Sequence, residues 1–206
     1  MTSLAPEYPF PTGVHDCWDV LTWSIENSKV LKATPTRGLI PGSSSAGRNI
    51  AAVLSLLARD KNLQPPITGQ ILSVPALLPS SSVPTNLAPL YQSRTTFTSD
   101  PVLGSFKESG LLEIYKPDPE SPLLDRFDHS GGDAGVAKAF FQVGGLDPLR
   151  DEAVLYDRKL RDAGVLMQFE LYAGYGHMFW TNWPELEESK KFIRDLVAGV
   201  SWLLES

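Results

Sequence analysis

Several features that mark other classes of protein are scarce or missing in this sequence of 206 residues. Cys17 is the single cysteine, so the chain can form neither an internal disulfide nor a metal site built from several cysteines. The formal net charge is −6 and no basic cluster stands out, which argues against nucleic acid or an anionic membrane surface as the main partner. The longest apolar stretches, such as residues 50–57, are far shorter than the roughly 20 residues that span a bilayer.

Signals of secretion are missing as well. Residues 1–13 contain neither the positively charged segment nor the apolar segment of a signal peptide. No asparagine lies in the Asn-x-Ser/Thr pattern that accepts an N-glycan. With the single cysteine, these absences favour a cytoplasmic protein. The chain has the composition of a folded protein, 42% hydrophobic and 20% charged, and its length predicts a single domain over residues 1–206, with the oligomeric state left open.

The order of the expected elements indicates an α/β fold. Hydrophobic periodicity predicts strands at residues 36–40, 68–78, 139–143 and 167–172, and helices at residues 16–27, 46–59, 151–164 and 186–204. Strands that alternate with helices are typical of a mostly parallel sheet covered by helices.

Residues 79–137 differ from the rest of the chain. Prolines recur through this segment, serines occur in runs, and only short helices are expected, near residues 87–93 and 102–112. The segment has no apolar pattern that would build a core of its own. We therefore predict a cap-like insertion that covers a site, rather than a second domain.

A serine-rich stretch lies between the first expected strand and its helix. Residues 42–47 read GSSSAG, which fits the Gly-x-Ser-x-Gly turn that presents a nucleophilic serine above a sheet. With Ser45 at the centre, Gly47 fills the second glycine position and a serine replaces the first. With Ser44 at the centre, Gly42 fits and an alanine replaces the second glycine. The spacing leaves both serines open, as well as a serine-rich helix cap with no catalytic role.

A serine nucleophile needs a base, and the sequence has three histidines. His177 follows the expected strand at 167–172 through a glycine-rich turn, and α/β sheets present catalytic groups at the carboxyl ends of their strands. His15 begins a helix and His129 lies in the cap-like insertion, so both are interpreted as solvated or capping residues. The pattern favours His177.

The base in turn needs an acid that fixes its tautomer. Asp147 follows the expected strand at 139–143, and the order Ser, Asp, His along the chain is that of α/β-hydrolases. Asp151 is the nearby competitor, although a carboxylate at the start of a helix also complements the helix dipole. The stretch HSGGDAG at residues 129–135 partly matches two catalytic motifs, a His-Gly-Gly oxyanion loop and a Gly-Asp-Ser-Ala-Gly turn. It has no serine at the central position of the turn and is interpreted as a flexible loop.

Several segments, in the same order, resemble the hormone-sensitive-lipase-like branch of the α/β-hydrolases, especially its fungal carboxylesterase-like members. They are LAPEYPFP at residues 4–11, GSSSAGRN at 42–49, SPLL at 121–124, GLDPLRDE at 145–152 and YAGYGHMF at 172–179. The resemblance covers nearly all of the chain. It implies Ser45 as nucleophile, Asp147 as acid, His177 as base and the backbone N–H of Ala46 as an oxyanion donor. It also implies a small carboxylic ester as substrate, no metal or organic cofactor, and a role in making or trimming a fungal secondary metabolite or toxin.

The sequence departs from that family in two places. Ser43 stands where the family has the first glycine of the turn, and a side chain there is expected to crowd the corner. The family's His-Gly-Gly-Gly oxyanion block precedes the LAPE segment, so a chain that starts at this segment is expected to lack that block and the early strands. Losing one oxyanion donor lowers turnover by about 100- to 1000-fold. A truncated non-catalytic member, an interaction module or an incomplete gene model are the alternatives to an active esterase.

Overall fold

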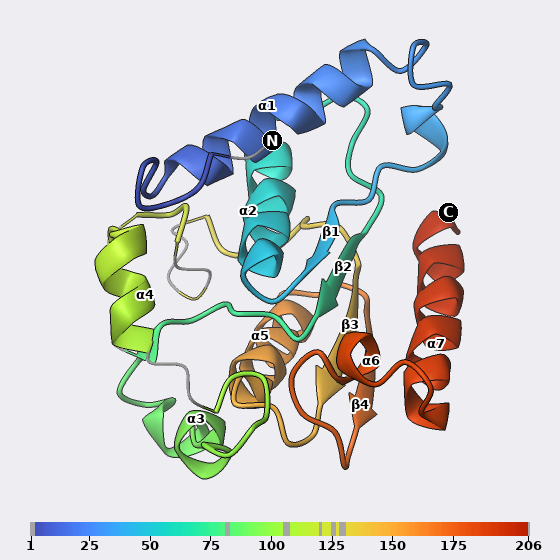
Figure 1. Cartoon of the computed structure of the whole chain (residues 1–206). Helices are drawn as coiled ribbons and strands as arrows, with labels where there is room; N and C mark the ends of the chain where they lie inside the picture. The colour runs from blue at the N-terminus through green and yellow to red at the C-terminus, as the bar shows by residue number, and fades with distance from the viewer. Residues whose placement is uncertain are drawn as a thin grey trace.

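A computed structural model describes residues 3–80, 83–104, 108–119, 121–124, 127 and 131–205 of the chain. Its centre is a four-stranded sheet in which each neighbouring pair of strands is parallel (Figure 1). The strands lie in chain order and are β1 (Gly42–Ser44), β2 (Gln70–Ser73), β3 (Ala139–Gly144) and β4 (Met167–Tyr172). Because the strands are parallel, the loops that follow them leave the sheet at the same edge.

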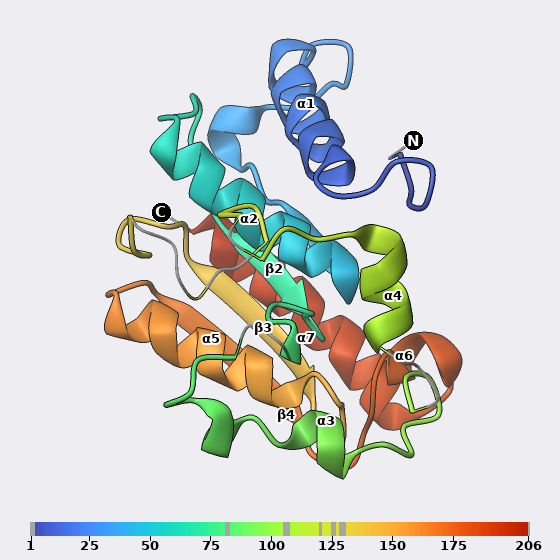
Figure 2. The same ribbon diagram turned by 90° about the vertical axis from the view of Figure 1, so that its left-hand side faces the viewer.

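Helices cover both faces of this sheet (Figures 1 and 2). α2 (Ala46–Asp60) and α5 (Arg150–Asp162) lie on one face, and α7 (Glu187–Leu204) lies on the other. α1 (Thr12–Glu26) packs against the outer side of α2. Shorter helices are η1 (Pro35–Arg37), η3 (Ala88–Leu90), α3 (Ser93–Thr96), α4 (Glu108–Tyr115) and α6 (Phe179–Asn182). The predicted α/β fold with a parallel sheet is confirmed.

Burial of apolar residues on both faces of β3 explains its central position. All six residues of β3 are buried. On the α5 face, the ring of Phe141 packs against those of Phe169 and Tyr156, with ring centroids 5.7 and 6.3 Å away. On the other face, Gly199 of α7 lies directly against the ring of Phe140, and a Cβ atom there would collide with it. A strand buried on both sides is expected at the centre of a parallel sheet.

Most of the predicted elements are confirmed. The helices at residues 46–59, 151–164 and 186–204 and the strands at 139–143 and 167–172 each agree with the structure to within two residues at either end. These segments have strong periodicity and clear glycine or charge signals at their ends, which are local properties of the sequence. The first helix, by contrast, begins at Thr12 rather than at residue 16.

The strand predicted at residues 36–40 is wrong. Pro35 opens η1, and the first strand comes only at Gly42–Ser44, a polar segment that pairs with β2. The apolar residue that suggested the strand, Leu39, packs instead in a cluster with Leu21 of α1 and Leu54 of α2. Burial against helices, not strand pairing, therefore accounts for the apolar run.

The strand predicted at residues 68–78 is too long. β2 ends at Ser73 because Val74 adopts a φ of 45°, which breaks the extended backbone, and Pro75 follows. Leu77 and Leu78 are buried beyond the strand, which is why the pattern looked continuous. The buried apolar residues thus extend beyond the end of β2, and the apolar pattern overestimated the length of the strand.

The structure describes residues 79–137 in part. A short helix, η3, lies within the predicted range 87–93, and α3 follows it. The helix predicted near 102–112 is shifted towards the C-terminus, since α4 ends at Tyr115. The described parts contact α5 and the loop that follows β4, since the carboxylate of Asp151 accepts backbone N–H groups at the start of α3 and His177 donates its N–H to Asp100. The segment therefore reaches the edge of the sheet where the strands end.

Candidate active site

Ser45 occupies the corner between β1 and α2. Its φ and ψ are 54° and −125°, a region of positive φ that side chains seldom adopt and that the strand–turn–helix corner of a serine nucleophile requires. The corner is held because the N–H of Ser45 bonds to the carbonyl of Ser73 at 3.3 Å and the N–H of Arg48 bonds to the carbonyl of Ser45 at 3.0 Å. Ser44 lies within β1, and the side chain of Ser45 makes no capping hydrogen bond to the helix.

Gly47 accommodates the unusual serine at position 43. A Cβ atom at Gly47 would lie 2.9 Å from the Cβ of Ser43 and would also collide with its hydroxyl. The side chain of Ser43 therefore uses space that the glycine leaves empty. The crowding expected at position 43 is relieved within the turn itself.

The side chains of Ser45, His177 and Asp147 form one hydrogen-bonded chain. Nε2 of His177 lies 3.0 Å from Oγ of Ser45, and Nδ1 lies 2.9 Å from Oδ2 of Asp147. The other oxygen of Asp147 accepts the N–H of Leu149 at 2.8 Å. His177 and Asp147 are 2% and 0% exposed, whereas Ser45 is only partly buried. Asp147 and His177 are therefore shielded from water, while Ser45 keeps part of its surface accessible.

The three residues come from three strands. Ser45 follows β1, Asp147 follows β3 and His177 follows β4. The loops after β3 and β4 are joined by backbone hydrogen bonds, from the N–H of Gly145 to the carbonyl of Tyr172 at 2.8 Å and from the N–H of Leu146 to that of Tyr175 at 2.9 Å. These bonds fix the relative position of the loops that carry the acid and the base.

The other sequence candidates lie elsewhere or do other things. His15 is an exposed residue of α1, and His129 lies outside the described residues. Asp151, the competitor of Asp147, accepts the N–H groups of Gln92 and Ser93, both at 2.7 Å, and thereby holds α3. In the described part of the HSGGDAG stretch, residues 131–135, Asp133 forms an ion pair with a lysine of α5.

Ala46 follows the serine as the first residue of α2 and is exposed. N–H groups in the first turn of a helix have no acceptor within the helix, and the helix dipole adds a partial positive charge at this end. The described residues contain no group of three or more His, Cys, Asp or Glu side chains that could hold a metal ion. Within the same residues, no helix is long and apolar enough to cross a membrane.

A model of the alpha/beta hydrolase fold matches residues 3–181 of the chain. The chain belongs to this α/β-hydrolase family. It is 35% identical over 201 residues to an AB hydrolase superfamily protein of Schizosaccharomyces pombe, covering 98% of this chain and 59% of the relative. It is also 26% identical over 206 residues to versiconal hemiacetal acetate esterase of Dothistroma septosporum, covering 98% of this chain and 61% of the relative.

A solved structure agrees with that assignment. The crystal structure of vibralactone cyclase superimposes with a TM-score of 0.94 at 28% sequence identity, and the match covers 99% of this chain and 60% of the cyclase. The α/β-hydrolase chain therefore spans about three fifths of the length of the proteins that it matches.

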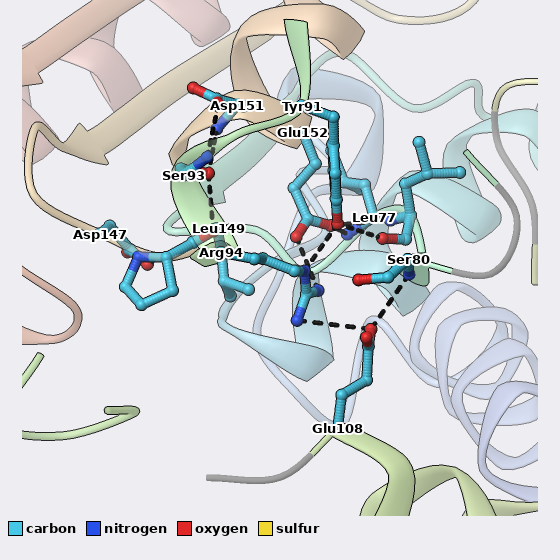
Figure 3. A network of polar contacts seen from close by, with 12 residues as sticks. Leu77, Ser80, Tyr91, Ser93, Arg94, Glu108, Asp147, Leu149, Asp151 and Glu152 are labelled. Carbon is cyan, nitrogen blue, oxygen red and sulfur yellow. Dashed lines mark hydrogen bonds and ion pairs between the residues drawn. The ribbon is translucent and has the colours of Figure 1, made fainter. Parts of the chain in front are cut away.

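In this α/β-hydrolase, a buried network that the sequence did not predict lies beside the acid (Figure 3). Glu152, in the first turn of α5, is fully buried and accepts the N–H groups of Leu77 and Leu78, the second at 2.7 Å. Arg94 of α3 donates to the same carboxylate at 2.8 Å and lies 3.3 Å from Glu108 of α4. The network joins α5 to the beginning of the 79–137 segment.

Burial has the largest influence on the pKa of Glu152. It raises the pKa of this carboxyl from its ordinary value to about 7, against the ion pair with Arg94 and the N–H groups of Leu77 and Leu78, which lower it. The sequence contained only a weak signal for this network, because an acidic residue at the start of a helix is also explained by the helix dipole.

Asp100 is a second buried acid that sequence reasoning missed. It lies in the 79–137 segment, is 7% exposed, and accepts the backbone N–H of His177 at 2.8 Å. The Asp-Pro pair at residues 100–101 favours a turn, but it gives no indication of a contact 77 residues away.

Proposed function

We propose that this chain hydrolyses small carboxylic esters through an acyl-enzyme on Ser45. The observation that carries the proposal is the hydrogen-bonded chain from Ser45 to His177 at 3.0 Å and from His177 to Asp147 at 2.9 Å, with the serine in a strained corner. A serine, a neutral imidazole and a buried carboxylate in this order are the parts needed for nucleophilic attack on an acyl carbon.

Each residue has one task in the proposed mechanism. Asp147 accepts a hydrogen bond from the Nδ1–H of His177 and does not take its proton, so the Nε2 lone pair faces Ser45 and takes the hydroxyl proton as the serine oxygen attacks the carbonyl carbon. The imidazolium then gives that proton to the leaving alcohol, and water releases the acyl group by the same route. The N–H of Ala46, at the positive end of α2, stabilises the negative charge on the carbonyl oxygen.

We propose that residues 79–137 act as a cap that limits the substrate to esters with a small acyl group. A cavity of about 460 Å³ lies between α4 and residues 117–124 and is lined mainly by apolar side chains, among them Leu112 and Leu124. The carbonyl of Leu124 accepts a hydrogen bond from Asn49 in the first turn of α2, which ties the cavity wall to the helix that follows Ser45.

A matched pair of variants tests the cap. Leu112→Trp fills the cavity and is expected to raise KM for nitrophenyl esters with longer acyl chains while leaving nitrophenyl acetate nearly unaffected. Leu111→Trp, at an exposed position on the same helix, is the control. If both variants change KM equally for all esters, the cavity does not select substrates by the length of the acyl chain.

The relatives support a biological substrate class. One relative is named as an esterase of versiconal hemiacetal acetate, and a structural neighbour as vibralactone cyclase. We propose that the natural ester is an intermediate or product of fungal secondary-metabolite or toxin synthesis. Acetate esters of bulky ring-containing alcohols should then be hydrolysed with higher kcat/KM than short aliphatic acetates.

A fluorophosphonate probe and nitrophenyl acetate test the activity itself. The wild-type chain should be labelled and should turn over the ester, Ser45→Ala should lose both, and Ser44→Ala should keep both. The second variant separates the two serines that the spacing left open. If the folded wild-type chain is neither labelled nor active, it is a non-catalytic member of the family, and the proposal fails.

A further inference from the structure

The backbone hydrogen bonds from the loop after β3 reach the loop of His177 only as far as Tyr175, two residues before the histidine. His177 is preceded by Gly174 and Gly176, and Met178, directly after it, adopts a left-handed backbone with a φ of 53°. Glycines enlarge the number of conformations that a loop can adopt. Yet the imidazole must meet Ser45 and Asp147 at the same time, which requires its backbone to be fixed from outside.

Asp100 supplies an anchor from the 79–137 segment. Its Oδ2 accepts the N–H of His177 at 2.8 Å, while its Oδ1 accepts the N–H groups of Val102 and Leu103 at 2.9 and 2.7 Å. The carboxylate is 7% exposed, so these bonds are little weakened by water. Bonds from N–H groups to an ionised carboxylate are among the stronger hydrogen bonds in proteins.

Gly176 leaves room for this anchor. A Cβ atom at Gly176 would collide with Oδ2 of Asp100, the oxygen that binds His177. The φ of Gly176 is not in the positive region that favours glycine. Glycine is needed at this position because a side chain would collide with Asp100, not because of the backbone conformation. Gly176 and the carboxylate of Asp100 are therefore in direct contact, although they are 76 positions apart in the sequence.

The turn at residues 97–103, which contains Asp100, is also linked to the loop of Asp147 through Arg150 of α5. The guanidinium of Arg150 lies 4.8 Å from the centre of the Phe97 ring, and its Nη1 donates to the carbonyl of Gly145 at 3.1 Å. Gly145 lies two residues before Asp147. Residues 97–103 are therefore linked to the loop of His177 directly, through Asp100, and to the loop of Asp147 indirectly, through Arg150.

We propose that Asp100 is a positioning residue for His177, through which the turn at residues 97–103 holds the imidazole in line with Ser45 and Asp147. Asp100 touches neither substrate nor the reacting atoms in this scheme. It acts by fixing the backbone from which the imidazole projects, and a small misplacement of a catalytic group can lower turnover by about 100-fold. The inference rests on the proposed function of the three residues.

Kinetics of Asp100 variants give the first test. Asp100→Ala should lower kcat for nitrophenyl acetate by about 10- to 100-fold with little change in KM, because the base is displaced while the substrate site is kept. Asp100→Asn has the same shape but can accept on one side only, so its kcat should lie between those of wild type and Asp100→Ala. Thr98→Ala, an exposed position in the same turn, should behave as wild type.

A proton NMR signal tests the geometry without any turnover. The Nδ1 proton of a histidine bonded to a buried carboxylate resonates far downfield, and its assignment to His177 follows from its loss in His177→Ala. The signal should be present in wild type and Thr98→Ala and weakened or lost in Asp100→Ala. This readout remains meaningful if the wild-type chain proves inactive, so failure of the proposed function and failure of the positioning role can be told apart.

A double-mutant cycle with Gly176 gives a third readout. Gly176→Ala should lower kcat in the wild-type background, where its Cβ displaces the carboxylate, and much less in the Asp100→Ala background, where the space is free. Thermal unfolding establishes that each variant is folded. If folded Asp100→Ala keeps the wild-type kcat and downfield signal, or if the two substitutions are additive, the positioning role is overturned.

Discussion

The centre of the sheet and the segment that follows β2 are held in place by different physical means. β3 is buried along its whole length and packs through aromatic rings such as Phe141. The described part of the 79–137 segment is instead tied down by three buried carboxylates, Asp100, Asp151 and Glu152, each of which accepts backbone N–H groups. Apolar volume fixes the strands that lead to the loops of Asp147 and His177, whereas a few directional hydrogen bonds fix the described part of the 79–137 segment beside them.

This difference has a consequence for single substitutions. Losing volume in the sheet should weaken the fold at every pH, because apolar burial has no titrating group. Losing a carboxylate should loosen one attachment, and the effect should depend on the proton that the carboxylate carries. Four substitutions test the comparison.

The largest effect is expected from Phe141→Ala in β3. Phe141 is fully buried, so removing its ring leaves a cavity between the sheet and α5 and should lower the free energy of unfolding by about 3–5 kcal/mol. Urea unfolding measures this change. Leu166→Ala, at a residue that is 68% exposed, is the control and should stay within about 0.5 kcal/mol of wild type. A loss below 1 kcal/mol for Phe141→Ala would show that the sheet is less tightly packed than the structure indicates.

Glu152→Ala should have the next largest effect. It leaves the N–H groups of Leu77 and Leu78 without their acceptor and removes the nearest counter-ion of Arg94, at an expected cost of about 3 kcal/mol. The same urea titration measures it, with Glu113→Ala on the exposed side of α4 as the control. Equal stability of the two variants would mean that the network contributes nothing to the attachment of the segment.

Arg48→Met should act in the opposite direction. Arg48 is 4% exposed, burial lowers its pKa, and within the part of the chain that the structure describes its Nε and Nη1 have no hydrogen-bond partner. Replacing this buried charge by an apolar side chain should raise the free energy of unfolding by about 1–4 kcal/mol. Arg59→Met on the same helix should lower it, since Arg59 donates to the carbonyls of Gly132 and Ala134. If both substitutions destabilise equally, Arg48 has a stabilising partner.

The most diagnostic effect concerns pH, and per pH unit it is the smallest of the expected changes. The folded pKa of Glu152, about 7, lies above the ordinary value of 4.5, so the folded chain binds this proton more tightly than the unfolded chain. Its contribution to the free energy of unfolding is therefore largest below pH 4.5, falls as the pH rises towards 7, and is constant above that. The slope is at most about 1.4 kcal/mol per pH unit.

Glu152→Gln removes that titration. Urea unfolding at a series of pH values should give a flatter profile for this variant than for wild type between pH 4.5 and 7. Phe141→Ala should shift the whole profile downward without changing its shape. A profile of Glu152→Gln parallel to that of wild type would assign the pH dependence to other groups.

The sequence predicted the parts of this protein whose signals are local. Residues 46–59 and 186–204 carry helical periodicity, and the glycine turns after residues 139–143 and 167–172 pointed to Asp147 and His177. The first strand was misplaced because the apolar residue Leu39 serves a helical cluster, and a polar segment pairs with β2 instead. Periodicity reports that a residue is buried but not which element buries it.

The sequence by itself determined the order of strands and helices and the kinds of residue at the ends of the strands, because turn chemistry and periodicity act over a few neighbouring positions. The local spacing left two serines open and the family resemblance implied Ser45; the tertiary structure places Ser45 at the corner, because residues 42–44 pair with β2. It also decided that Ser45 meets His177 across 132 positions and that Asp100 meets the same histidine across 77. Such contacts result from packing of the whole sheet and its helices, and no short stretch of sequence encodes them.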